Sequence, residues 1–180
     1  KAIDKDKLNF TELSNKNIIK KNYRVRGAIA CQQSHLSVLK KFLKSSSKTC
    51  LILEDDLKKS DLNLDEFNSS VDNLMKDLPK TFDILYLGRC FDNCKIQKKI
   101  SNNLVQNFHP KCTHAYGVTR KAAEIIIKNL EYNMSMPIDW NYATLIKEKK
   151  MKSYASYPAI FHQNRKELGS TIGSNGSLPE

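Results

Sequence analysis

Long apolar runs are missing from this sequence of 180 residues. No uninterrupted apolar stretch approaches the roughly 20 residues that span a bilayer, and no stretch resembles a secretory signal peptide. These absences predict a soluble chain with a cytoplasmic location. The sequence begins at Lys1 rather than at a methionine, so removal of a targeting segment would leave the lumen of the endoplasmic reticulum or a virion as alternatives.

Arginine is scarce although the formal net charge is +11. It occurs only at Arg24, Arg26, Arg89, Arg120 and Arg165, and lysines scattered along the chain supply most of the positive charge. Proteins that read nucleic-acid sequence rely on the forked guanidinium group of arginine. The composition therefore argues against a nucleic-acid partner, whereas the dispersed charge would attract smaller polyanions such as nucleotide diphosphates.

Cysteine is limited to five residues, and no two of them have the C-x-x-C spacing. An odd number without paired spacing gives no support for a zinc site and favours a reducing compartment. Cys90 and Cys94 are close enough in sequence to form a bond with each other or to occupy one turn.

Three adjacent carboxylates, Glu54-Asp55-Asp56, end an apolar run. Residues 50–53 are apolar without alternation, which is typical of a strand covered on both faces of a parallel sheet. Ligands bind at the carboxyl ends of such strands, and adjacent carboxylates repel one another unless a cation lies among them. The stretch favours a divalent metal with oxygen ligands; the alternative is a solvated acidic turn.

Hydrophobic periodicity predicts a single α/β domain over residues 1–162. After a polar start with at most one short helix, helices are expected at 27–44, 64–78, 120–130 and 140–149. Strands are expected at 49–54, 82–88, 104–109, 115–119 and 153–157. The helix between the first two strands is a βαβ signature, which implies a parallel pair. Residues 163–180 are expected to be a mobile tail.

Five blocks of residues stand in a fixed order along the chain. They are Gly27-x3-Cys31-x2-Ser34-His35, Leu51-Ile52-Leu53-Glu54-Asp55-Asp56, Asp83-Ile84-Leu85-Tyr86-Leu87-Gly88, His114-Ala115-Tyr116-Gly117-Val118-Thr119-Arg120-Lys121-Ala122-Ala123 and Pro137-Ile138-Asp139. In this order they closely resemble glycosyltransferase family 25, the group of lipooligosaccharide and collagen galactosyl- or glucosyltransferases. The resemblance covers about 27–139, and residues 158–163 fit it more loosely.

The resemblance implies a GT-A-like, Rossmann-like α/β fold, with a mainly parallel sheet flanked by helices. It implies a hexosyltransferase that moves galactose or glucose from a UDP-sugar, with inversion, to a hydroxyl of a glycan, a lipid-linked glycan or a protein. The cofactor would be Mn²⁺ or Mg²⁺. A metal that bridges the two phosphates neutralises the charge that develops on the leaving UDP.

The family's acidic motif maps onto Glu54, Asp55 and Asp56, which are therefore the expected donor-binding residues. Glu54 and Asp56 would be metal ligands, joined by analogy by His162 near the end of the domain. Asp139 is the expected catalytic base that takes the proton of the acceptor hydroxyl. The alternative for Asp139 is the N-cap of a helix from Trp140 onward.

Four further donor-binding candidates follow from the matched blocks: Ser34, His35, His114 and Tyr116. Ordinary packing is the alternative for each, and for His35 it takes the form of a hydrogen-bonded core histidine. Trp140 is expected to fill the core rather than to stack on a sugar.

One departure from the family pattern affects these expectations. Family members usually begin with a strand, an Arg-rich turn and a helix that help to bind the nucleotide, whereas this sequence begins at a later segment. The implied fold is therefore incomplete at its N-terminus, with exposed apolar surface and unpaired sheet edges, so we expect an oligomer or a partner chain to cover them. The alternative function is a non-catalytic relative that acts as an interaction or carbohydrate-binding module.

Overall fold

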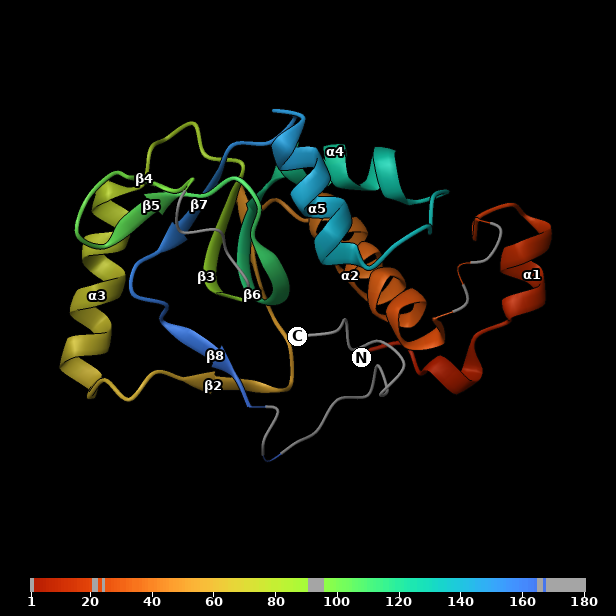
Figure 1. Cartoon of the computed structure of the whole chain (residues 1–180), viewed down its shortest axis with the longest axis horizontal. Coiled ribbons are helices and arrows are strands. Elements are labelled where there is room, and N and C mark those ends of the chain that lie inside the picture. The colour runs from red at the N-terminus through yellow and green to blue at the C-terminus, as the bar shows by residue number, and fades with distance from the viewer. Residues whose placement is uncertain (1, 21–22, 24, 91–95, 165–166, 168–180) are drawn as a thin grey trace.

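The computed structural model describes residues 2–20, 23, 25–90, 96–164 and 167 (Figure 1). The helical elements are η1 (Lys5–Lys7), α1 (Phe10–Asn15), α2 (Arg26–Lys44), α3 (Leu64–Asp77), α4 (Arg120–Leu130) and α5 (Ile138–Lys147). The strands are β1 (Thr49–Leu53), β2 (Leu57–Lys59), β3 (Ile84–Cys90), β4 (Lys98–Lys99), β5 (Leu104–Gln106), β6 (Lys111–Thr119), β7 (Ser153–Ser156) and β8 (Phe161–Gln163). The prediction of an α/β fold is confirmed.

The main sheet has six strands in the order β1-β6-β3-β7-β5-β4. Among the described strands of this sheet, only β3 and β7 pair in parallel, and each of the other neighbouring pairs is antiparallel. The expected predominance of parallel pairs is therefore not found. β1 and β3 do run in the same direction, as the βαβ signature predicts, but β6 lies between them and pairs with both.

Helices cover the two faces of the sheet unequally (Figure 1). Side chains of α2, α4 and α5 pack with Ile84 and Tyr86 of β3, whereas α3 packs with Leu85 from the other face. Successive side chains of a strand point to opposite faces, so β3 is buried from both sides. Full burial of one such side chain contributes roughly 1.5–3 kcal/mol.

The helix termini agree with their local sequence signals. Asn63 and Glu66 form a reciprocal capping box at the start of α3, an arrangement that satisfies two backbone donors at once. Thr119 accepts a hydrogen bond from the backbone N–H of Ala122 and caps α4, as predicted. These helices begin within one residue of their expected positions.

β1 lies at one edge of the sheet and is covered on one face only. Ile52 is buried, but Leu51 and Leu53 are 55% and 48% exposed. The expectation that this strand is covered on both faces is wrong, because among the described residues α3 covers other strands. Leu51 and Leu53 therefore form exposed apolar surface beside an edge of the sheet.

A second, two-stranded sheet joins β2 to β8 in antiparallel register. Both strands have three residues, which is too short for periodicity to indicate them. Their pairing brings the three residues after Asp56 beside Phe161–Gln163, with Lys58 opposite His162. The tail expected at 163–180 lies largely outside the described residues. None of the described helices has the length and apolar character needed to cross a lipid bilayer.

Candidate functional site

The acidic triplet forms the turn between β1 and β2. The backbone N–H of Glu54 donates to the carbonyl oxygen of His114 at 2.9 Å, which extends the pairing of β1 with β6 by one residue. Asp55 is exposed. Asp56 is half-buried, and its Oδ2 accepts a hydrogen bond from Gln163 Nε2 at 3.1 Å. The triplet therefore presents its charges at the end of the main sheet.

Glu54 is held by two side chains that stabilise its ionised form. Its Oε1 lies 3.1 Å from His35 Nε2 and accepts a hydrogen bond from Thr113 Oγ1 at 2.7 Å. Burial alone would raise the pKa of Glu54, but the hydrogen bond and charge of His35, together with the bond from Thr113, outweigh burial and lower that pKa. A carboxylate that is held ionised in this way is better suited to bind a cation than to accept a proton.

His35 links Glu54 to a buried pair of tyrosines. Its Nδ1 lies 2.8 Å from the hydroxyl of Tyr116, which in turn lies 3.1 Å from the hydroxyl of Tyr142. The rings of His35 and Tyr116 also stack, with centroids 5.7 Å apart. Burial raises the pKa of Tyr116 well above its ordinary value, so both hydroxyls keep their protons. The chain of contacts fixes the orientation of the imidazole that faces Glu54.

Cys31 is a site residue that the sequence prediction missed. It lies one helical turn before His35 on α2, so the two side chains share a face. Ligand atoms of Cys31, His35 and Glu54 lie within 4.8 Å of one another. Burial raises the pKa of the Cys31 thiol, and the negative charges of Glu54, Asp139 and Asp56 raise it further. Cys31 therefore belongs to the same cluster of polar side chains as His35 and Glu54.

His114 lies in the same region on β6, with 1% of its surface exposed. Gly88 of β3 makes room for it: a Cβ on this glycine would lie 2.2 Å from His114 Nε2. Burial lowers the pKa of His114, and the neighbouring carbonyl of Phe161 partly opposes this effect. Because its imidazole is largely neutral, His114 is better suited to form a hydrogen bond with a polar ligand than to supply a fixed positive charge.

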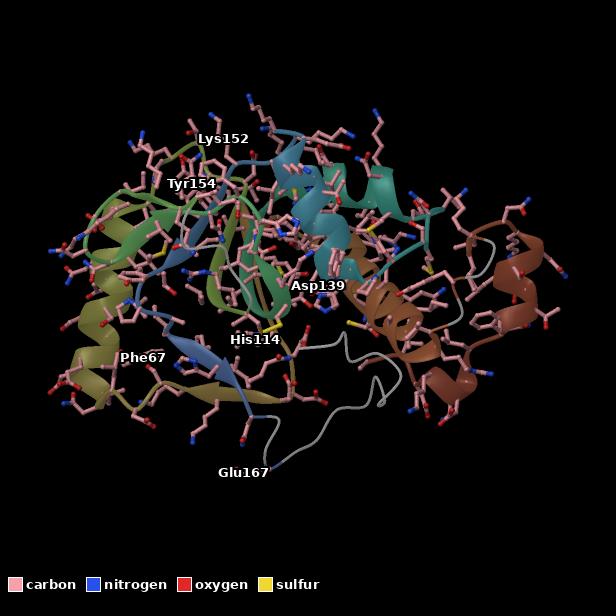
Figure 2. The ribbon with its side chains drawn as sticks, viewed as in Figure 1. Phe67, His114, Asp139, Lys152, Tyr154 and Glu167 are labelled. Carbon is pink, nitrogen blue, oxygen red and sulfur yellow. A yellow bond between two sulfur atoms is a disulfide. The ribbon has the colours of Figure 1, made fainter. Side chains whose placement is uncertain are left out.

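Asp139 reaches the site from the first turn of α5. Its Oδ2 accepts a hydrogen bond from the backbone N–H of Cys112 at 3.0 Å, which ties α5 to the start of β6. The helix begins at Ile138 with Pro137 as its N-cap residue, so Asp139 is not the helix cap. Figure 2 shows Asp139 and His114 on the same side of the molecule.

Cys112 forms a disulfide with Cys90 across β6 and β3. Cys112 also has a φ of 65°, a left-handed conformation that is unfavourable for a residue with a Cβ by about 1–2 kcal/mol. The bond fixes the backbone that donates to Asp139. This pairing does not agree with the prediction that the cysteines are reduced, and it rules out a bond between Cys90 and Cys94, one of the two possibilities that their spacing left open.

Lys111 lies beside Asp139 and is 6% exposed. Its Nζ lies 3.3 Å from the centroid of the Trp140 ring, a cation–π contact. Burial lowers the pKa of Lys111 to about 8, although the charge of Asp139 opposes this effect. Trp140 remains 37% exposed, so the prediction that it fills the core is wrong.

The predicted metal ligands are only partly brought together. In the described part of the chain, two sets of residues place three potential ligand atoms within 4.8 Å: Cys31, His35 and Glu54, and Cys90, Cys112 and His114. The two sulfurs of the second set are joined in the disulfide, so they do not act as thiolate ligands. The predicted set of Glu54, Asp56 and His162 is not among these sets. Glu54 and Asp56 supply the carboxylate oxygens that Mn²⁺ and Mg²⁺ prefer, so the donor chemistry fits such an ion, while His162 is exposed on β8.

The hydroxyl of Ser34 forms hydrogen bonds with backbone groups of the N-terminal segment and of α2. It accepts a hydrogen bond from the backbone N–H of Ile3 and donates to the carbonyl of Ala30, each at 2.8 Å. These bonds tie the N-terminal segment to α2. A role of Ser34 in donor binding stays a prediction.

Comparison with known proteins identifies the family of the chain. The model of the family described as "Glycosyltransferase family 25 (LPS biosynthesis protein)" matches residues 1–141. This match covers more than half of the chain, so the chain belongs to glycosyltransferase family 25.

One relative adds detail. Mouse procollagen galactosyltransferase 2 is 25% identical to this chain over 171 residues, which is 87% of this chain. The same alignment covers 27% of the relative, so this chain spans about a quarter of the length of the curated relative that it matches.

Proposed function

We propose that the chain provides the catalytic part of a hexosyltransferase that moves galactose or glucose from a UDP-sugar to an acceptor hydroxyl with inversion. The observation that carries this proposal is that two adjacent residues of β6, Cys112 and Thr113, donate hydrogen bonds to Asp139 and to Glu54 in a member of a glycosyltransferase family. These carboxylates come from the β1–β2 turn and from α5. Such an arrangement supports two roles, cation binding and proton removal.

Asp139 is the proposed general base. Inversion requires that the acceptor oxygen attack the anomeric carbon from the face opposite the departing UDP, while a carboxylate takes the hydroxyl proton. The bond from the Cys112 N–H occupies Oδ2 and fixes the orientation of the carboxylate. Glu54 is a poorer base because His35 and Thr113 already engage its Oε1.

Glu54 and Asp56 are the proposed holders of Mn²⁺ or Mg²⁺. When bound, such an ion would supply positive charge for the diphosphate of the donor. Thr113 and His35 hold Glu54 in place for this role, and Gln163 does the same for Asp56. His114 and Tyr116 are proposed to shape the donor pocket, His114 by contact and Tyr116 by orienting His35.

The disulfide supports a revision of the expected location. Cys90–Cys112 is a bond of the kind that persists in oxidising compartments and is rare in the cytosol. We therefore propose the lumen of the endoplasmic reticulum, already an alternative at the sequence level, in place of the cytoplasm. Mapping of the Cys90–Cys112 cross-link in the protein purified from its host under alkylating conditions tests this proposal.

Thermal unfolding with ligands tests the proposed function. The chain is unfolded with Mn²⁺ alone and with Mn²⁺ plus UDP, UDP-galactose or UDP-glucose. A donor at about a hundred times its dissociation constant should stabilise the fold by about 2.7 kcal/mol. The absence of a shift with every nucleotide would overturn donor binding by this chain.

A second candidate function rests on the open edge of β1. Leu51 and Leu53 form an exposed apolar pair beside that edge, and an exposed edge can pair with another strand. This observation favours an interaction module whose partner, or a second copy, covers β1. Ligand-independent dimerisation without any donor-induced shift would support this function over the transferase.

A further inference from the structure

A cavity of about 650 Å³ lies away from the acidic turn. It is bounded by the last turn of α5, the segment 106–109 and the start of β7. In Figure 2, Lys152, one of its lining residues, is labelled near the upper edge of the molecule, whereas His114 is labelled near its middle. The volume is within the range of about 300–1,000 Å³ that small-molecule sites occupy.

One part of the cavity wall is apolar. Ile96 and Phe108 line it while remaining 47% and 37% exposed, and the buried Ile146 and Met151 also line it. Exposed aliphatic and aromatic side chains that gather at a concave surface favour an apolar ligand group.

The rim of the cavity is positively charged. Lys147, Lys149 and Lys152 line it and are exposed. No carboxylate is found among the described lining residues. The nearby Glu148 pairs with Lys150 at 2.8 Å, and neither residue lines the cavity. The three ammonium groups therefore favour an anion.

Asn107 adds an unused donor at the wall. It is fully buried, and its Oδ1 accepts a hydrogen bond from Ser153 Oγ at 2.5 Å, which fixes the orientation of the amide. Among the residues that the structure describes, its Nδ2 finds no hydrogen-bond partner. Buried polar groups are nearly always satisfied in native proteins, so an unused buried donor at a cavity points to an acceptor supplied from outside the chain.

We propose that this cavity binds a small phosphate ester with an apolar substituent. The phosphate oxygens would face Lys149, Lys152 and the amide of Asn107, and the substituent would lie against Phe108 and Ile96. A dianionic head group suits several lysines better than a single carboxylate does. Because the lining residues are separate from the acidic turn, this site does not depend on the proposed transferase activity.

The test is a binding titration of the full chain with octyl phosphate, followed by calorimetry and by the side-chain amide signals of asparagine in NMR spectra. Inorganic phosphate, octanoate and octyl glucoside, each below any micelle concentration, separate the contributions of phosphate, of charge alone and of the apolar chain. The variants are the double substitution Lys149→Gln/Lys152→Gln and Phe108→Ser. Lys128→Gln, an exposed lysine of α4, is the matched control.

Octyl phosphate is expected to bind at one site and to shift the Asn107 amide signal. The double lysine substitution should weaken binding roughly tenfold or more, because each charge-assisted contact contributes enough free energy to change a dissociation constant by about that factor. Phe108→Ser should weaken the binding of octyl phosphate but not that of inorganic phosphate. Lys128→Gln should leave the binding of both compounds unchanged. The proposal would be overturned if octyl glucoside or octanoate bound as tightly as octyl phosphate. It would also be overturned if the double variant bound octyl phosphate as tightly as the wild type.

Discussion

His35 uses both of its ring nitrogens, one toward Glu54 and one toward Tyr116. The tyrosine hydroxyl is the only described link between the imidazole and Tyr142. Because these groups are buried, the loss of one hydroxyl would leave two polar partners without a bond. The orientation of Glu54 therefore depends on a residue that is not itself at the acidic turn.

Tyr116→Phe tests that dependence. It removes only the hydroxyl, so the free energy of unfolding should fall by about 1–3 kcal/mol, the usual cost of unsatisfied buried groups. Urea unfolding measures the change. Tyr132→Phe is the matched control, since Tyr132 is 67% exposed. A loss no larger than that of the control would contradict a structural role of the hydroxyl chain.

The pKa of Lys111 makes the stability of the fold depend on pH, and substitution of Lys111 isolates this contribution. Its pKa is about 8 in the folded chain against an ordinary 10.5, so between these pH values the unfolded state holds more protons. Stability attributable to Lys111 must therefore rise as pH rises through this window, and it is lowest below pH 8. The stability of the wild type relative to Lys111→Met should increase between about pH 7 and 10.

Thermal unfolding at several pH values measures this difference. Lys128→Met, at an exposed position, should run parallel to the wild type throughout. Parallel curves for Lys111→Met as well would show that the Lys111 proton is held equally in both states.

The sequence predicted much of the site, for a definite reason. Glu54 directly follows a strand and His35 lies within a helix, both of clear periodicity, and the structure brings the two beside Cys31. Asp139 lies in the first turn of α5 and accepts a hydrogen bond from Cys112 of β6. Cys31 itself was missed, although its position one turn before His35 was a usable signal. The bond between Cys90 and Cys112 spans 22 residues, and local spacing does not reveal such a partner.

At the scale of elements, the close contact of β3 and β6 depends on a glycine. Gly88→Ala would place a Cβ 2.2 Å from His114 Nε2 and 2.5 Å from the Phe161 carbonyl oxygen. The backbone oxygen has little freedom to move away, so we expect a loss of about 1–3 kcal/mol, as for other overpacked sites. Denaturant unfolding measures this loss.

Gly117→Ala is the matched control on the neighbouring strand. The nearest atom to its added Cβ would be the Cys50 carbonyl oxygen at 3.9 Å, an ordinary contact. This variant should be nearly neutral. Equal effects of the two substitutions would contradict the crowding described at Gly88.

The elements also show where prediction from sequence stops. Helices and buried strands follow from hydrophobic period, so α2, α3, α4, β1 and β3 lie close to their expected positions. The position of β6 between β1 and β3 could not be predicted from the sequence. A buried apolar strand has the same sequence pattern in a parallel and in an antiparallel sheet. The exposed Leu51 and Leu53 depend on which elements lie beside β1, which is a property of the whole sheet.

For the molecule as a whole, the disulfide closes a loop of 22 residues between two central strands. Reduction should lower the free energy of unfolding by about 2–4 kcal/mol, since the cross-link restricts the unfolded chain. Urea unfolding with and without a phosphine reductant measures this loss. The Cys90→Ser variant should be insensitive to the reductant, and a wild type equally insensitive would show that the bond contributes no stability.

The central claim, that one site of this chain both binds the donor and removes the acceptor proton, is tested most directly by measuring both properties on the same variants. Donor binding is followed by thermal shift with Mn²⁺ and UDP-hexose, and turnover by release of UDP in the presence of an acceptor. Asp139→Asn should keep the donor shift and lose about 10²–10⁴-fold in turnover, whereas Glu54→Gln should lose the Mn²⁺-dependent shift. Wild-type turnover in Asp139→Asn, or an unchanged shift in Glu54→Gln, would contradict the account.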